Sequence, residues 1–341
     1  MKKITIREVA KEANVAISTV SKALNNTGYV SESTAKRVQD AVFKLRYQVN
    51  ANARSLKAER TNKIGLIVSY INNPYLMSIA KEIEETIRSI GCHMILMSHN
   101  DDTKQESELI QLILEQQVDG LVLVPTGGNK ALIEDVQERG IPVIAVDRLA
   151  DGVVTDSIED DNYYGSYEAI SYLNKLGHHK IALLYGHRNH SNGRGRYQGA
   201  VDAMEELGNP VDERYIRQGW FHEEEAYRET KEMLLLHEPP TAIYSCNNTM
   251  TKGALRALIE QDLKVPEDMS IIAFGDREQW ELITPKLTLI TQPMKRIGTE
   301  AASLLKNRLT LKEVYEPKQI VIKPKLEIGE SCARLNTNKE G

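Results

Sequence analysis

The first residues whose types could do chemistry lie between positions 17 and 22. Lys22 can donate to guanine O6 and N7, and Ile17 can pack on a thymine methyl group, if both enter a DNA major groove. Ser18 would join them at base edges, while Thr19 and Ser21 would reach phosphates. On a solvated helix face the same side chains would do nothing. The surrounding elements therefore decide between these interpretations.

The flanking sequence predicts three short helices. Thr5 followed by Glu8 is the pattern of a capping box at a helix start. Two stretches with apolar residues at helical spacing follow, and Asn14 between them suits the left-handed backbone of a tight turn. A third helix is expected over residues 33–45. In a helix-turn-helix the second helix places its first residues in the major groove, so the sequence predicts a DNA-binding head.

Charge is distributed unevenly along the 341 residues, although the whole chain carries only −5. Residues 1–60 hold 12 Lys and Arg against five acids, a net charge of +7, which leaves −12 for the remainder. A solvated basic tail would be the alternative explanation. Together with the three helices, the split indicates a head that faces a polyanion and a body with another task.

Composition excludes several classes of protein. No apolar run approaches the ~18 residues of a membrane-spanning helix, and no apolar signal core follows the basic start, so we expect a cytoplasmic protein. Cys92, Cys246 and Cys332 have neither a disulfide nor a zinc-site spacing, and no metal is expected. The glycine-rich nucleotide loops and the nucleophile elbow are missing as well. We therefore expect no enzyme and no cofactor.

From residue 63 onward, short apolar runs alternate with amphipathic stretches. This alternation predicts an α/β body of doubly wound parallel sheets, and about 270 residues suit two sheets better than one. Ligands of such sheets bind beyond the carboxyl ends of the strands, so the loops there should hold the ligand. The expected strands are 64–68, 94–97, 120–124, 143–146, 181–184, 242–245 and 270–274, and the expected helices are 75–90, 105–115, 164–176, 195–207, 223–236 and 250–261. The candidate ligand loops are 70–75, 147–148, 159–162, 188–196, 220–221, 247–248 and 275–280.

The run from Thr5 to Asn25 resembles the head of the lactose/galactose-repressor family of bacterial regulators. The resemblance continues to Leu56, which matches the hinge-helix leucine that opens the central base step in the minor groove of that family's operators. Such a wedge costs a few kcal/mol of unstacking, which the bend and added contacts offset. The DNA-binding residues that the resemblance implies are Thr5, Ile17, Ser18, Thr19, Ser21, Lys22, Asn25, Tyr47, Asn50, Ala53 and Leu56.

Landmarks of the same family recur to about residue 330, including Asn73-Pro74-Tyr75 and Asp161-Asn162. The family's body resembles periplasmic sugar-binding proteins, with two lobes, a cleft and three chain crossings. The implied domains are a head at 1–48, a hinge helix and linker at 49–62, a body at 63–330 and a short polar tail at 331–341. Within the body, the N-lobe would comprise 63–160 and 291–320, and the C-lobe 161–290 and 321–330.

The resemblance also implies the ligand contacts. Arg196 would hydrogen-bond a ligand oxygen in fork geometry, and Phe221 would stack on a sugar or base ring. Two alternatives stay open, because Asp147 and Arg148 could form a local salt bridge and Phe221 could be a core residue. The effector-binding residues implied are Asn73, Tyr75, Asp147, Arg148, Asn162, Arg194, Arg196, Phe221, Asn247 and Asp276.

Two departures from the family bear on the effector. Asn247-Asn248 stands where many members have Asn-Asp, and Gly275 stands where many have an Asp, so the acid is shifted to Asp276 or absent. Fewer carboxylates would suit an anionic ligand, because guanidinium groups pair with carboxylate or phosphate. The arginines expected near the cleft are Arg148, Arg188, Arg194 and Arg196. The hypothesis is a sugar acid or phosphorylated sugar in preference to a neutral sugar.

These features together predict a ligand-controlled repressor of carbohydrate-use genes. Each head would read one half of a pseudo-palindromic operator, as two-fold protein symmetry requires. The tail is too short and polar for a leucine heptad, which favours a homodimer over a tetramer. A solute-binding receptor would explain the body alone, and an enzyme on a doubly wound fold lacks a motif. Neither alternative explains the head.

Overall fold

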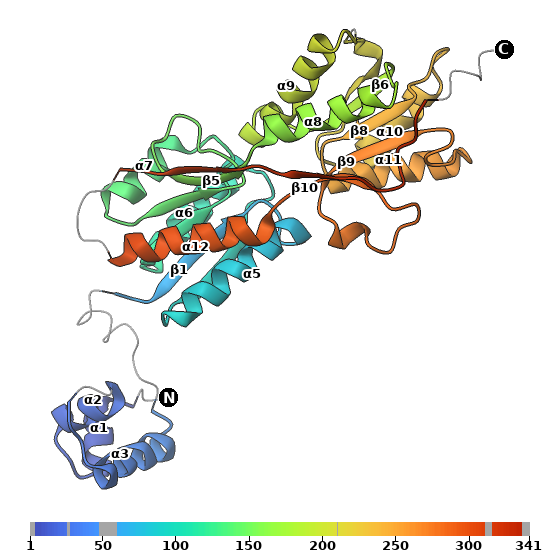
Figure 1. The fold of residues 1–341 in the computed structure, drawn as a ribbon. Helices are drawn as coiled ribbons and strands as arrows, with labels where there is room; N and C mark the ends of the chain where they lie inside the picture. The colour runs from blue at the N-terminus through green and yellow to red at the C-terminus, as the bar shows by residue number, and fades with distance from the viewer. Residues whose placement is uncertain (1–3, 26–27, 48–59, 210, 311–315, 336–341) are drawn as a thin grey trace. The chain divides into compact units, whose positions relative to one another are not determined.

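The computed structural model describes residues 4–25, 28–47, 60–209, 211–310 and 316–335. The chain divides into two compact units, residues 1–61 and 62–341 (Figure 1). Among the described residues, no helix combines the length and apolar character needed to cross a membrane.

The first unit is a three-helix head: α1 (Ile6–Glu12), α2 (Ile17–Asn25) and α3 (Glu32–Leu45). The expected capping box is confirmed, with the Thr5 backbone N–H donating to the Glu8 carboxylate at 2.7 Å. The expected left-handed turn residue is confirmed too, because Asn14 has φ 53°. Val9, Val20 and Val38, one from each helix, are fully buried together. This small core fixes α2 against the other two helices.

One sheet of the second unit has the strand order β11-β5-β4-β3-β1-β2, with parallel neighbours throughout. Side chains from successive residues of β1 alternate between two apolar clusters, one under α5 and α12 and one under α6 and α7. Figure 1 shows α5 and α12 side by side. The elements are β1 (Lys63–Val68), α5 (Pro74–Ser89), β2 (His93–Ser98), α6 (Thr103–Glu115), β3 (Gly120–Leu123), α7 (Lys130–Glu138), β4 (Val143–Val146), β5 (Asp156–Asp160), α12 (Met294–Thr310) and β11 (Gln319–Ile322).

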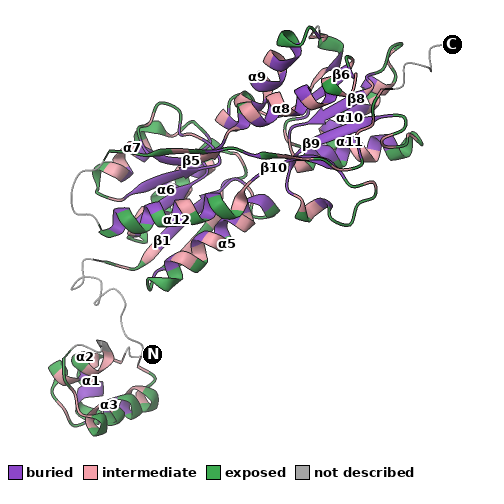
Figure 2. Cartoon of the chain, viewed as in Figure 1, coloured by how far each residue is buried: buried purple, intermediate pink, exposed green. Residues whose placement is uncertain are grey.

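The other sheet has the order β12-β10-β9-β8-β6-β7, in which only β12 is antiparallel to its neighbour. Its strands are largely buried between helices, as Figure 2 shows. The elements are α8 (Asn162–Lys175), β6 (Ile181–Tyr185), α9 (Ser191–Glu206), η1 (Glu213–Tyr215), β7 (Ile216–Gln218), α10 (Glu223–Leu234), β8 (Ala242–Ser245), α11 (Asn248–Glu260), β9 (Ser270–Gly275), η2 (Glu278–Trp280), β10 (Thr288–Thr291) and β12 (Lys325–Glu327).

The chain passes between the two sheets after β5, after β10 and after β11. The first two passages are joined by a hydrogen bond from Gln292 Nε2 to Asp160 Oδ2 at 2.5 Å. The carboxyl ends of the parallel strands in both sheets supply loops to the same region. The expected two-sheet α/β class is therefore confirmed.

Two expectations need correction. The loop expected over residues 188–196 ends early, because α9 already begins at Ser191 and carries both Arg194 and Arg196. The polar tail expected from residue 331 begins later. Ser331 Oγ donates to the carbonyl of Ile271 at 2.6 Å, and the Leu335 N–H donates to the carbonyl of Leu176 at 2.8 Å. Residues 331–335 thus belong to the lobe that contains β9.

Candidate functional site

The start of α2 presents the head's candidate base-reading side chains. Ile17 is 45% exposed although it is apolar, and Ser18 and Lys22 are exposed beside it. Thr19 and Ser21 are half-buried. An exposed isoleucine at the first position of a helix-turn-helix recognition helix is available for apolar contact with a base.

The remaining candidate residues of the head fall into two groups. Thr5 caps α1, and Tyr47 is half-buried against the core of the head. Cations on the head's surface are exposed, which suits contact with a polyanion. The side chain of Asn25 and the residues Asn50, Ala53 and Leu56 lie outside the described part of the chain.

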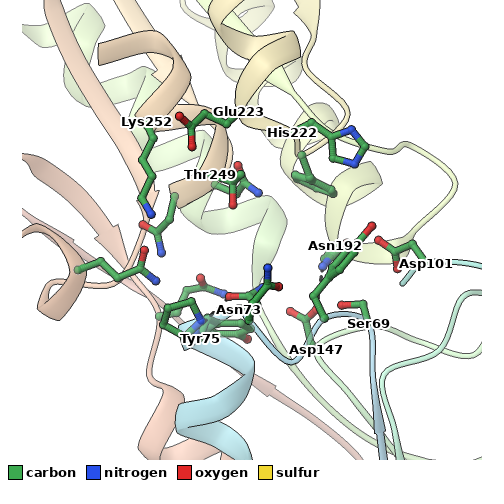
Figure 3. A pocket seen from close by; sticks show the side chains of 18 of the residues that line it. Ser69, Asn73, Tyr75, Asp101, Asp147, Asn192, His222, Glu223, Thr249 and Lys252 are labelled. Atoms are coloured by element: carbon green, nitrogen blue, oxygen red, sulfur yellow. Dashed lines mark hydrogen bonds between the residues drawn. The ribbon is translucent and has the colours of Figure 1, made fainter. Parts of the chain in front are cut away.

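A cavity of about 610 Å³ lies between the two lobes, lined by the segments that follow strands of both sheets (Figure 3). Its size is typical of a small-molecule site. The sequence-derived candidates that line it are Asn73, Tyr75, Asp147, Arg148, Arg196, Phe221 and Asn247. The other described lining residues are Ser69, Tyr70, Asn72, Pro74, Asp101, Asn192, His222, Glu223, Glu224, Glu225, Asn248, Thr249, Lys252, Gln279 and Gln292.

Arg196 is held rigidly in the wall of the cavity, with only 4% of its surface exposed. Its Nε donates to Asn162 Oδ1 at 2.7 Å and its Nη1 to the Cys246 carbonyl at 2.6 Å. The guanidinium lies 3.8 Å from the centroid of the Phe274 ring. Nη2 makes no hydrogen bond with any residue in the described ranges, so its N–H groups can donate to an acceptor in the cavity. Asn162 does not line the cavity and acts by positioning Arg196.

Arg148 is neutralised within the protein. It donates two hydrogen bonds to the Asp101 carboxylate, at 2.6 and 3.3 Å, and its Nε lies 3.7 Å from Asp147. Burial alone would raise the pKa of Asp101, but Arg148 outweighs burial and the net pKa is lowered. The expected Asp147 salt bridge is thus the weaker of two, and Arg148 brings little free charge to a ligand.

Asp147 projects into the cavity from a left-handed residue after β4, with φ 67°. Its Oδ2 accepts from Asn192 Nδ2 at 3.1 Å, which links the two lobes at this point. A carboxylate held in this way can accept hydrogen bonds from ligand hydroxyls. Asn192 sits in the first turn of α9, in the range that was expected to be a loop.

Phe221 forms an apolar patch of the wall. A Cβ atom on Gly186 would lie 2.2 Å from its ring, so the ring occupies space that only a glycine at 186 leaves free. The His187 ring lies 6.1 Å away and Trp220 packs on His187 at 5.0 Å. Phe221 is half-buried, in contact with the core and with the cavity at once. The interpretation as a core residue therefore holds in part, and stacking on a ligand ring stays a prediction.

Two other candidates lie outside the lining. Arg194 is exposed and pairs with Asp151 at 3.1 Å. Asp276 is buried, and its oxygens accept from Asn248 Nδ2 at 3.0 Å and the Gln279 N–H at 2.9 Å. Arg188, counted as a cleft arginine, stacks over Tyr197 at 4.2 Å. Of the four arginines expected near the cleft, Arg148 and Arg196 line the cavity and Arg188 and Arg194 do not. Of the two in the lining, Arg148 is paired with Asp101, and Arg196 keeps one guanidinium nitrogen without a protein partner.

Two carboxyl groups at the end of β5, Glu159 and Asp160, have raised pKa values. Asp160 Oδ2 accepts from the Tyr75 hydroxyl at 3.2 Å as well as from Gln292, while Oδ1 has no partner within the described residues. Burial raises the pKa of Asp160 to about 6, and burial together with Asp147 raises the pKa of Glu159 to about 7. Among the residues with assigned positions, no cluster of His, Cys, Asp and Glu could hold a metal ion.

Sequence reasoning missed several lining residues for identifiable reasons. Asp101 lines the cavity from a turn after β2, where it has a left-handed φ of 57°. Its place after an expected strand is the sequence signal that could have identified it. Gln292 follows β10, a strand that was not expected. Lys252 lies inside a helix, where a lysine ordinarily indicates a solvated face.

Comparison with known proteins places the whole chain. Residues 5–50 match the family described as bacterial regulatory proteins, lacI family, and residues 61–329 match periplasmic binding proteins and the sugar binding domain of the LacI family. The HTH-type transcriptional repressor PurR of Actinobacillus pleuropneumoniae serotype 3 (strain JL03) is 32% identical over 97% of this chain and 99% of its own. The HTH-type transcriptional regulator DegA of Bacillus subtilis (strain 168) is 33% identical over 98% and 100%.

A solved structure agrees with these matches. The transcriptional regulator CelR in complex with cellobiose has a TM-score of 0.73 and 27% identity, and the likeness covers 96% of this chain and 99% of that one. With both families matched along nearly its full length, the chain belongs to the lacI family of bacterial regulatory proteins.

Proposed function

We propose that this protein represses carbohydrate-use genes by binding a pseudo-palindromic operator as a homodimer, under the control of a sugar-type effector. The observation that supports this most directly is a ligand-sized cavity, in the same chain as a helix-turn-helix, whose walls offer the free Nη2 of Arg196. Nothing in these groups supports a covalent step. The cavity is suited to binding and release.

The chemistry of the walls favours a sugar-type effector. Hydroxyl groups need donors and acceptors close together, and Arg196 with Asp147 supplies both. The Phe221 ring provides an apolar face for the C–H side of a sugar ring. Asn73 and Asn247 add amide groups from opposite lobes, so a ligand that contacts both would favour one lobe geometry. The cellobiose in the CelR complex is consistent with this class.

Within that class we propose a sugar acid or a phosphorylated sugar. Three of the four arginines that first favoured an anion are committed elsewhere, so the support now comes from the missing acid at Gly275 and from Lys252. Effector binding would either raise or lower the affinity for operator. The direction depends on which lobe geometry the effector binds better, since only such a difference in affinity shifts the equilibrium between the two geometries.

Arg196→Ala tests the proposal, with Arg194→Ala as the matched control on the same helix. We expect Arg196→Ala to weaken effector binding at least tenfold, because a charged donor in a buried wall is lost, while operator binding without effector is kept. Arg194→Ala should behave like the parent protein, since Arg194 does not line the cavity. Calorimetry with a panel of sugars, sugar acids and sugar phosphates, paired with an operator-binding assay, measures both.

The proposal fails if Arg196→Ala leaves effector affinity unchanged in a protein that binds operator normally. It fails equally if no member of the panel changes operator affinity in the parent protein. Circular dichroism of both variants checks that the fold is kept.

A further inference from the structure

One end of the cavity, where α11 meets the loop after β9, has no free carboxylate from that loop. Both oxygens of Asp276 are occupied by Asn248 Nδ2 and the Gln279 N–H. A Cβ atom on Gly275 would lie 1.9 Å from Asn248 Oδ1, which accepts from Trp280 Nε1 at 2.7 Å. The anchored Asn248 side chain thus occupies the place of a side chain at 275. This end of the cavity is closed to an acid at that position.

Hydrogen-bond donors remain at the same end. Lys252 lies four residues after Asn248 on α11, so both are on one side of the helix, and both line the cavity. Figure 3 shows the Lys252 side chain extending from α11 into the pocket. Its ammonium has no ion pair or hydrogen bond with any described residue. Gln279, also in the lining, has a buried Nε2 without a partner among those residues.

The glutamates of the lining are in part neutralised by two arginines that lie outside it, and none of them forms an ion pair with Lys252. Arg256 holds Glu224 at 2.7 Å and lies 3.4 Å from Glu223. Arg228 holds Glu225 at 2.5 Å. At the opposite end Asp101 is paired with Arg148. Among the described cations that line the cavity, Lys252 is therefore the one whose side chain has no ion pair or hydrogen bond within the protein.

We infer that Lys252 and Gln279, with Thr249 beside them, form a subsite for the anionic group of the effector, a carboxylate or a phosphate. The inference rests on the proposed function for the rest of the ligand, whose hydroxyls would meet Asp147 and Arg196. An ammonium without a carboxylate partner, next to a buried amide donor that needs an acceptor, is complementary to an oxyanion. Lys252 would then distinguish an anionic sugar from its neutral counterpart.

Inorganic phosphate provides a first test that does not depend on the sugar. Thermal unfolding is followed while phosphate replaces chloride at constant ionic strength, in the parent protein, Lys252→Gln and the surface control Lys175→Gln. We expect saturable stabilisation by phosphate in the parent and in Lys175→Gln, and its loss in Lys252→Gln. Equal stabilisation of all three proteins, or none in any, counts against the subsite.

Matched sugar pairs provide the second test. Calorimetry compares glucose, galactose and mannose with their aldonates, uronates and 6-phosphates, which also separates carboxylate from phosphate as the preferred group. We expect at least tenfold tighter binding of one anionic form than of its neutral counterpart, reduced to about twofold by Lys252→Gln. Lys252→Arg should restore part of the preference because it keeps the charge. Gln279→Ala should weaken the anionic form alone.

The two tests separate the possible failures. If sugars bind regardless of charge and Lys252→Gln has no effect on either test, the subsite is wrong and the proposed sugar-controlled repressor stands. If phosphate stabilisation depends on Lys252 but no sugar of either charge binds, the subsite stands and the sugar class is wrong. If neither phosphate nor any sugar binds, both are wrong.

Discussion

The buried carboxyl group of Asp160 should make the stability of the protein depend on pH. Burial raises its pKa to about 6, above the ordinary value of 3.8, against the opposing effects of Gln292, Arg196 and Tyr75. Folding therefore favours the protonated form, and this contribution to stability is lost as pH rises from about 4 to about 6. We expect Asp160→Asn to flatten that part of the stability profile, by on the order of 1 kcal/mol. Urea denaturation between pH 4.5 and 7.5 measures it.

Glu159→Gln is the companion to this measurement. The pKa of Glu159 is raised to about 7 by burial and by neighbouring acids, so its contribution is lost at higher pH, between about 4.5 and 7. The two ranges overlap, but the effect of Glu159→Gln should extend up to about pH 7, beyond the range that Asp160→Asn affects. Profiles that run parallel to that of the parent protein across the whole range would contradict both assignments.

The sequence predicted some of the residues that line the cavity and not others. Arg196, Asp147 and Phe221 were predicted because a resemblance supplied their positions, and each lines the cavity. Lys252 was not predicted, because a single lysine in an amphipathic helix reads as solvated. Its proposed role depends on contacts in three dimensions, such as the Asn248 side chain that occupies the place of a side chain at Gly275.

At the scale of elements, the packing of α8 on α9 positions Asn162 and Arg196. A Cβ atom on Gly199 would lie 2.2 Å from the backbone oxygen of Tyr163, so the two helices touch at this point. We expect Gly199→Ala to push them apart, lowering the free energy of unfolding by about 1–3 kcal/mol and weakening effector binding. Urea denaturation and calorimetry measure the two effects. Gln198→Ala, on the exposed side of α9, should change neither, and equal effects of both substitutions would refute the packing argument.

Some strands were not predicted because the local sequence pattern does not reveal them, and β5 is an example. β5 reads Asp-Ser-Ile-Glu-Asp, which has little of the apolar character of the strands that were expected. Its first residue, Asp156, is fully buried because Arg308, from α12, donates two hydrogen bonds to it at 2.8 and 2.9 Å. A partner 152 residues away cannot be read from a local window. The strands that were expected consist of buried apolar residues, and hydrophobic periodicity and composition are enough to predict such strands.

At the scale of the whole molecule, the cavity is joined to the passages between the lobes. Gln292 lines the cavity, stands at the second passage and donates to Asp160 at the first, and Asp160 also accepts from Tyr75 at the cavity floor. A ligand that moves Gln292 or Tyr75 therefore disturbs both passages at once. Such a connection is what control of operator binding by an effector requires, because each site must bias the same two-state element.

Gln292→Ala tests this connection through linkage. If an effector changes operator affinity by some factor, operator must change effector affinity by the same factor. We expect Gln292→Ala to reduce that factor severalfold while each ligand still binds alone, because the link between the passages is cut. Titrations of effector with and without operator, and of operator with and without effector, give the factor twice. Ser69→Ala removes a lining hydroxyl at the end of β1 and leaves the passages intact. It should weaken effector binding without changing the factor by which effector and operator alter each other's affinity. A factor equal to that of the parent protein in Gln292→Ala would show that the lobes communicate by another route.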